Sequence, residues 1–307
     1  MQRTWTLTLR VITPLVMAGA DQGIAEWRAA SIKGMIRWWF RIAGGSRTDE
    51  ERLFGAVGRD GARSSLLTVG TTPVPRSQPL NPLPAPYFGF SIKMNQRRVI
   101  PVGENLQVTF RVAPWADDTD FAKIRAAVWL AFYLGNFGTR SRKGYGSLVV
   151  TGSSDSYFEV FSPSVEQIVT VYRRKIDPTL SALSSSSRRI RGVWLVQKPW
   201  RIIEQEYKAM RREMDVPHKA YLGYPFHPSE RERPDPNWPT RFASPLIIKP
   251  LGGDVIVLTA IDVPAGVCQA FQGQMSPQFN RFKEKFNDFI KGLSPQRLWP
   301  ERRRPDA

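Results

Sequence analysis

Residues 135–148 read GNFGTRSRKGYGSL and place four glycines around three cations, Arg140, Arg142 and Lys143. Glycine adopts positive φ angles and lets another group approach the backbone closely, whereas neighbouring cations repel one another unless an anion or solvent separates them. We therefore expect this glycine-rich loop to hold a polyanion, with backbone amides exposed at Gly138, Gly144 and Gly146. A solvated loop between a helix and a strand is the alternative interpretation.

The segments on either side of the loop have regular patterns. Residues 121–135 predict a helix, preceded by Asp117, Asp118 and Asp120. A cluster of three aspartates can bind a metal, but carboxylates also cap a helix and are favoured by its dipole in the first turn. We favour the capping role. After the loop, residues 144–152 are typical of a strand.

A second basic element lies nearer the amino terminus. Residues 27–43 predict a helix whose apolar face carries Ile32, Ile36, Trp39 and Ala43. Lys33, Arg37 and Arg41 are spaced by four residues and form a stripe in which no glutamate is interleaved. This favours a phosphate-binding face over a solvated one. Trp38 stands beside the stripe and is the best candidate for stacking on a base.

The order of elements in the first half predicts an α+β fold. Alternating polar and apolar residues indicate a strand over residues 5–12, and a proline-rich stretch at 71–86 is expected to be an extended excursion. Further strands are predicted at 65–70, 87–93 and 105–112. The resulting order is that of a ferredoxin-like (RRM-like) sandwich.

The second half has a similar but less regular mixture. Helices are predicted at 164–176, 199–214 and 276–292, and strands at 192–196, 244–250 and 255–262. Gly252 and Gly253 mark a hairpin between the last two strands. We therefore expect two ferredoxin-like domains in tandem, residues 1–155 and residues 156–307, the second degenerate.

The charge of the chain points to a polyanionic partner. Its 307 residues include 44 Lys and Arg against 27 Asp and Glu, a net charge of +17. No acid occurs between Asp60 and Glu104 or between Asp120 and Asp155, which indicates basic surface patches. Nucleic acid is the first candidate partner and an anionic membrane a distant second.

The residues of common catalytic and metal sites are scarce. The single Cys268 cannot form an intramolecular disulfide or a multi-thiolate metal site, and P-loop, HExxH and GxSxG motifs are missing from the sequence. We expect no cofactor. His218 and His227 leave open a metal-independent endoribonuclease with histidine as general base.

The sequence has no run of 18 apolar residues, so we expect a cytoplasmic protein.

Several short motifs carry a family resemblance. They are TPLVMAGADQ (13–22), RAASIKGMIRWWFR (28–41), LFG (53–55), FGTRSRKGYGSL (137–148), YLGYPF (221–226) and RFASPLIIKP (241–250). In order and wording they resemble the RAMP superfamily of CRISPR proteins, and within it a subunit of the type III-B (Cmr) RNA-guided effector complex. The sequence departs from the family pattern at Ala18 and Ala20, and at Asn136, which interrupts the glycine-rich loop.

This resemblance implies two ferredoxin-like domains, other Cmr subunits as partners, and contacts with CRISPR RNA toward its 3′ part and with target RNA. It also implies that nuclease activity belongs to another subunit. The resulting hypothesis is a non-catalytic RNA-binding subunit without a membrane partner. Its predicted RNA-binding residues are Lys33, Arg37, Trp38, Arg41, Gly138, Arg140, Arg142, Lys143, Gly144 and Gly146.

Two alternatives stay open beside that hypothesis. One is the endoribonuclease, and the other is a structural assembly subunit that binds acidic protein partners without RNA. Arg188, Arg189 and Arg191 follow a serine-rich run and are either a second RNA contact or part of a disordered tether.

Overall fold

The computed structural model describes residues 3–58, 61–74, 77–89, 92, 97–183, 189–214, 244–262 and 275–300, with only the backbone for 275–280. His218, His227, Cys268 and Arg188, together with the motif at 221–226, lie outside the described residues. In the described part of the chain, no helix is long and apolar enough to cross a membrane.

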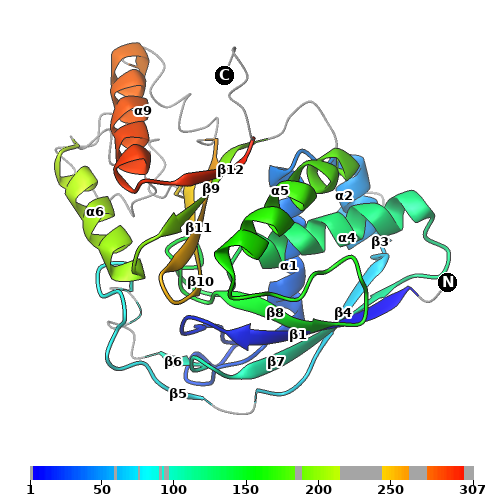
Figure 1. The fold of residues 1–307 in the computed structure, drawn as a ribbon. Helices are drawn as coiled ribbons and strands as arrows, with labels where there is room; N and C mark the ends of the chain where they lie inside the picture. Colours follow the sequence, from blue (N-terminus) through cyan, green and yellow to red (C-terminus); the bar gives the residue numbers. More distant parts are fainter. Residues whose placement is uncertain are drawn as a thin grey trace.

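The first half contains a four-stranded antiparallel sheet in the order β4-β7-β1-β8. Its strands are β1 (Thr4–Val11), β4 (Leu67–Thr71), β7 (Asn105–Val112) and β8 (Leu148–Ser153). Helices α1 (Ala29–Ile42) and α4 (Asp118–Tyr133) lie on one side of this sheet (Figure 1). Strand alternation sends the apolar residues of β1 and β7 inward and leaves Arg10 and Arg111 exposed.

The second half contains another four-stranded antiparallel sheet, in the order β10-β11-β9-β12. Its strands are β9 (Ile190–Gln197), β10 (Leu246–Gly252), β11 (Val255–Ile261) and β12 (Gln296–Trp299), and α6 (Trp200–Arg212) and α9 (Met275–Gly292) connect them. Gly252 and Gly253 have positive φ and form the predicted hairpin. In both sheets the strands, counted along the chain, stand in the order second, third, first, fourth.

Smaller elements join and brace these sheets. Helix α5 (Val165–Ala182) follows β8 and packs on α4, where the Tyr172 hydroxyl donates to the Tyr133 carbonyl over 2.6 Å. Helix α2 (Arg47–Phe54) packs on α1. Two further pairs of short antiparallel strands are β2 (Ala56–Gly58) with β3 (Gly61–Arg63) and β5 (Gln78–Pro79) with β6 (Arg98–Val99).

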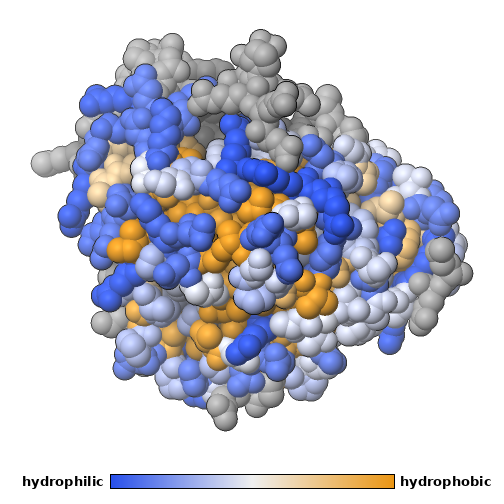
Figure 2. All heavy atoms as spheres, viewed as in Figure 1, coloured by the Kyte–Doolittle hydropathy of each residue, from blue (hydrophilic) through white to orange (hydrophobic). Residues whose placement is uncertain are grey.

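The two halves share their apolar cores. The larger core includes Trp5 and Trp39 from the first half and Val193 and Trp299 from the second, and a smaller core places Tyr145 among residues of the second half. Figure 2 shows apolar residues (orange) across the middle of the face viewed in Figure 1, with hydrophilic residues (blue) around them. The domain boundary at residue 155 stays a prediction, and both cores cross it.

Most predicted elements are present, with local differences. The strand predicted at 87–93 is wrong, because residues 87–89 form a turn and residue 92 is helical. The helix predicted at 164–176 continues to Ala182 and includes Pro178. Residues 144–147 are not strand, because the chain turns there before β8 begins. Helix α2 and strand β12 were not anticipated.

A buried lysine links the two sheets. Lys249 of β10 is 1% exposed, and its ammonium donates to the carbonyls of Gly135 and Leu148 at 2.8 and 2.9 Å. Both carbonyls belong to the first half, at the two ends of the glycine-rich loop. Burial lowers the pKa of Lys249 to about 7.

The lowered pKa of Lys249 predicts that stability rises with pH. Between the folded pKa of about 7 and the unfolded value, the unfolded state binds more protons, so the free energy of unfolding increases with pH. From pH 7 to 9.5 we expect a gain of about 3 kcal/mol from this group. Urea unfolding at both pH values measures it, and Lys249→Met should flatten the increase.

Lys291→Met is the matched control, because that ammonium is exposed on α9 and its removal should leave the increase intact. Lys143 is also buried with a lowered pKa, so part of the increase should persist in the Lys249 variant. An unchanged pH dependence in Lys249→Met contradicts the assignment.

Candidate nucleic-acid interface

One carboxylate, that of Glu50, pairs with the cationic stripe of α1. Lys33, Arg37 and Arg41 share a side of α1 as predicted, but Arg37 and Arg41 both pair with Glu50 of α2, Arg41 over 3.0 Å. The expectation that no acid offsets the stripe is therefore wrong, because the acid comes from a neighbouring helix. One carboxylate against two guanidiniums leaves the stripe positive, and half of the Arg41 side chain is exposed.

Lys33 completes the stripe at the first turns of α1. It is half-buried, and burial together with the nearby Arg37 lowers its pKa. Burial and the Arg37 charge both disfavour the charged form of Lys33, so a nearby anion would stabilise its ammonium.

The three loop cations lie in different environments. Arg140 is half-buried at a positive φ of 60°, Arg142 turns toward α1, and Lys143 is buried. The expected common grip on a polyanion therefore does not extend to Lys143. Its ammonium donates to the Tyr207 hydroxyl and to Ser244 Oγ at 2.5 and 3.1 Å, inside the second half.

Desolvation dominates the electrostatics of Lys143. Burial lowers its pKa well below the ordinary value, and the cations Arg211, Arg140 and Arg142 act in the same direction. The Tyr207 ring, 3.8 Å from the ammonium, supplies a cation–π contact in place of a carboxylate. Lys143 is thus a packing and hydrogen-bonding residue, and its predicted contact with a phosphate is not available in this conformation.

The glycines of the loop are required by the protein itself. Gly138, Gly144 and Gly146 all have positive φ, as predicted. A Cβ at Gly138 would collide with the Val16 carbonyl, and one at Gly146 with the Phe137 carbonyl. At Gly144 the Trp200 ring occupies the space, 2.6 Å from the Cβ position. The close approach that these glycines permit is therefore made by the chain's own backbone and side chains.

The loop pairs with β10 of the second half. The Ile248 amide donates to the Arg142 carbonyl over 3.1 Å, and Lys143 forms a parallel bridge with Ile248. The Asn136 side chain donates to the Ile248 carbonyl over 2.7 Å. The Arg142 guanidinium donates to the Ser244 carbonyl over 2.7 Å. The sequence did not predict that the loop pairs with β10. The only sign of this pairing in the sequence is the polar residue Asn136 within the glycine-rich loop.

The loop and α1 do meet, at Arg142. Its guanidinium lies 4.7 Å from the centre of the Trp38 ring, and Trp38 is half-buried. The loop and α1 therefore meet through these two side chains. Burial and the nearby Arg189 lower the Arg142 pKa to about 10. No carboxylate contacts Arg142 in the described part of the chain.

The aspartates before α4 have the capping role that was favoured. The Asp117 side chain accepts from the Asp120 amide over 2.6 Å, and Asp118 and Asp120 lie in the first turn. Asp120 is buried and pairs with Arg52 of α2. Among the described residues, no group of His, Cys, Asp and Glu is arranged to hold a metal ion.

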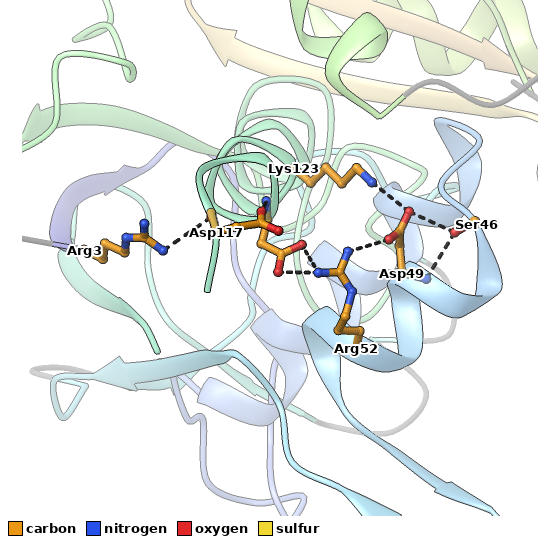
Figure 3. Close-up of polar contacts among 7 residues, drawn as sticks. Arg3, Ser46, Asp49, Arg52, Asp117 and Lys123 are labelled. Carbon is orange, nitrogen blue, oxygen red and sulfur yellow. Dashed lines mark hydrogen bonds and ion pairs between the residues drawn. The ribbon is translucent and has the colours of Figure 1, made fainter. Parts of the chain in front are cut away.

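Figure 3 shows how this ionic cluster joins α2 to α4. Asp49 accepts from Arg52 and Lys123 at 2.7 and 2.8 Å. Burial opposes its ionisation, but hydrogen bonds from Lys123, Arg52 and Ser46 lower its pKa to about 2. The cluster is a structural brace that positions Glu50, which belongs to the same helix as Asp49.

The arginines near β9 make protein contacts. Arg191 forms an ion pair with Asp262, in which the guanidinium donates to the carboxylate Oδ2 over 2.7 Å. The Arg189 amide donates to the Ile42 carbonyl over 3.0 Å. Residues 189–191 are thus ordered against α1 and the end of β11, and a disordered tether does not describe them. Arg189 adds positive charge beside Arg142.

Comparison with known proteins gives consistent results. Residues 8–149 match the RAMP superfamily. The CRISPR system Cmr subunit Cmr1-2 of Pyrococcus furiosus is 29% identical over 175 residues, covering 46% of this chain and 92% of that protein. Subunit Cmr1-1 of the same organism is 29% identical over 154 residues, covering 44% of this chain and 43% of its own length.

Solved structures resemble the whole chain. The apo crystal structure of Cmr1 from Pyrococcus furiosus has a TM-score of 0.63 at 19% identity, covering 97% of this chain and 99% of that one. A chain of the type III-B Cmr-beta complex bound to cognate target RNA and AMPPnP has a TM-score of 0.54 at 11% identity, covering 95% of this chain and 100% of that one. At these identities the matches establish a shared fold.

The glycine geometry predicts a stability effect that is independent of any ligand. Gly146→Ala should lower the free energy of unfolding by more than about 2 kcal/mol, because the residue has a φ of 69° and its Cβ would meet backbone. Gly34→Ala is the matched control on the exposed side of α1, where nothing lies within 4 Å. It should raise stability by about 0.5–1 kcal/mol.

Urea unfolding of both variants measures these changes. If Gly146→Ala unfolds like the unmodified protein while RNA binding weakens, the glycine serves a ligand and the structural explanation is wrong.

Proposed function

We propose that the chain is a non-catalytic RNA-binding subunit of a type III-B (Cmr) CRISPR interference complex, because residues 8–149 match the RAMP superfamily and the chain shares its fold with Cmr subunits. In this role it contacts CRISPR RNA toward its 3′ part and the paired target RNA in antiviral defence, beside other Cmr subunits. One observation carries the RNA contact: Arg142 lies against Trp38 of α1, the helix that carries the stripe, and no carboxylate contacts Arg142 in the described residues.

The proposal includes the architecture of two ferredoxin-like domains, 1–155 and 156–307. Its support is the shared strand order of the two sheets, together with a helix between the first and second strands and another between the third and fourth. Helix α5 then serves as the connection between the domains. A net charge of +17 supports a polyanionic partner.

Within this proposal the RNA-contacting residues are divided by their exposure. Lys33, Arg37 and Arg41 form the positive stripe of α1, and Arg142 of the loop lies against Trp38 of the same helix. Arg140, which is half-buried, is the remaining proposed RNA contact of the loop. Gly138, Gly144, Gly146 and Lys143 act indirectly, by fixing the loop that carries Arg142.

The two alternatives have weaker support. An endoribonuclease would use His218 or His227, which lie outside the described residues. An RNA-independent assembly subunit would offer its basic surface to acidic proteins. Incubation of the purified protein with RNA tests the first, since cleavage lost in His218→Ala or His227→Ala would favour a nuclease. Incorporation into the complex without RNA would favour the second.

The proposed RNA contact predicts a change in salt dependence. Each phosphate neutralised on a single strand contributes about −0.7 to the slope of log K against log salt. Lys33→Ala/Arg41→Ala should therefore reduce the magnitude of that slope by about 1.4. Fluorescence anisotropy with a 12-nucleotide single-stranded RNA at several salt concentrations measures it.

Arg10→Ala/Arg111→Ala is the matched control, because it removes the same charge from exposed positions on the opposite side of the first sheet. It should leave the slope nearly unchanged. Equal reductions in both double variants would show that binding follows net charge alone, against a localised interface. A loop variant that removes Lys143 is a poor test, since it disturbs buried contacts.

A further inference from the structure

Strand β4 is an edge of the first sheet, because among the described strands it pairs with β7 alone. In an antiparallel pair, alternate residues direct both backbone groups toward the partner strand, and the residues between them direct theirs away. The Ala113 amide donates to the Leu66 carbonyl over 2.9 Å. The Val112 amide points the other way, to the Arg3 carbonyl just before β1. Continued along β4, this alternation turns the amides and carbonyls of three residues away from the sheet: Leu67, Val69 and Thr71.

This edge is closed at the first of the three residues and open at the other two. Ser65 Oγ lies 3.1 Å from the Leu67 amide nitrogen and 2.8 Å from its carbonyl oxygen, so it takes the place of a neighbouring strand. In the described part of the chain, the outward groups of Val69 and Thr71 make no hydrogen bond, and both residues are only half-buried. Two amides and two carbonyls are therefore free to pair with an added strand.

The sequence of β4 has none of the usual protection of an edge strand. Natural edge strands are commonly shielded by a charged residue, a proline or a bulge. Strand β4 reads LTVGT, and residues 64–72 contain neither a charged residue nor a proline. Its pairing with β7 runs without a shift in register. Such an edge suits β-strand addition, in which main-chain hydrogen bonds hold an extended peptide.

The cationic stripe of α1 borders the closed end of β4. Helix α1 packs on β4, and the Arg37 guanidinium donates to the Gly55 carbonyl over 3.2 Å. Gly55 lies against Ser65, since a Cβ at Gly55 would stand 3.3 Å from the Ser65 amide nitrogen. Ser65 is the residue that closes the edge at Leu67. Arg37 is therefore beside the edge.

Helix α1 follows β4 toward its open end. The Trp27 indole, just before α1, donates to the Gln107 carbonyl over 2.9 Å, and the next residue of β7 is the one opposite Thr71. Lys33 precedes Arg37 by four residues, which is about 6 Å of helix and nearly the length of two strand residues. Lys33 therefore stands about level with Val69, where the edge is open.

From this arrangement we propose that β4 binds an extended acidic segment of a partner protein as an additional antiparallel strand. The segment exchanges hydrogen bonds with the outward amides and carbonyls of Val69 and Thr71. Val69 packs on the core beneath the helices, so the segment's side chains on that face lie toward α1. There its carboxylates pair with Lys33 and Arg37, a stripe that Glu50 neutralises only in part. This site goes beyond the proposed RNA contact, and RNA and the segment would compete for Lys33.

The antiparallel geometry specifies which amides of the segment are needed. The probe is a blocked seven-residue peptide of alternating threonine and glutamate, followed by fluorescence anisotropy. Residues opposite each other share a face, so the glutamates that face α1 also direct their amides to Val69 and Thr71. N-methylation of the glutamate amides should weaken binding about tenfold or more, because those amides no longer donate. N-methylation of the threonine amides is the matched control and should leave binding nearly unchanged.

The matching change in the protein is Thr71→Pro. It removes one outward amide, and proline is tolerated on an edge strand where its nitrogen faces solvent. The variant should bind the peptide about tenfold or more weakly, whereas Thr71→Ala, which keeps the amide, should not. Both variants should bind the 12-nucleotide RNA like the unmodified protein. A peptide with glutamine in place of glutamate should bind more weakly, because it lacks the charges that pair with Lys33 and Arg37.

Equal binding of the glutamate-methylated and threonine-methylated peptides overturns the proposal, and so does equal binding of the glutamine peptide. Either result leaves the RNA-binding function standing. A dimer of the unmodified protein that Thr71→Pro abolishes would assign the edge to a second copy and also overturn the proposal. If Thr71→Pro does not fold, the methylated peptides decide with the unmodified protein. Failure to bind RNA in a salt-dependent way overturns the proposed function instead.

Discussion

The pairing of the glycine-rich loop with β10 is the contact on which the rest of the structure depends. The loop donates and accepts along Ile248, and Lys249 returns hydrogen bonds to both ends of the loop. Loops normally lie at the surface because their backbone polar groups need partners. Here those partners come from the second sheet, which allows the loop to be buried between the two halves. Positive φ at Gly138, Gly144 and Gly146 is the geometric condition for that burial.

The same pairing divides the cations of the loop between structure and surface. Lys143 and Lys249 are buried on carbonyl, hydroxyl and aromatic partners, and burial lowers the pKa of both. A charge in such a site is costly without a paired carboxylate, so these lysines weaken the folded state at low pH. Arg142 is intermediate between the buried lysines and the surface cations. Its guanidinium donates to the Ser244 carbonyl and also lies near the Trp38 ring. Its position is a consequence of the loop's attachment to β10.

Local patterns made much of the fold predictable, and contacts between distant segments made the rest inaccessible. Alternation identified β1 and β7, helical periodicity identified α1 and α4, and Gly252 with Gly253 identified a hairpin. The contacts around the site were less predictable. The spacing of charges predicted the stripe of α1, but it could not predict that Glu50 of α2 pairs with it. Likewise, the local sequence around Lys143 is the same whether its side chain faces solvent or Tyr207. Burial is decided by the second half of the chain.

The cavity between α1, the glycine-rich loop and β10 depends on how the two halves pack against each other. Met35 and Trp38 come from α1, Arg142 from the loop and Ile247 from β10, so the cavity between them exists only while the loop stays on the second sheet. A shift of β10 would move Ile247 and the Ser244 carbonyl that anchors Arg142 together. The positive stripe of α1, by contrast, depends on α2 and its brace to α4, all within the first half. The cavity and the positive stripe of α1 therefore have separate structural supports.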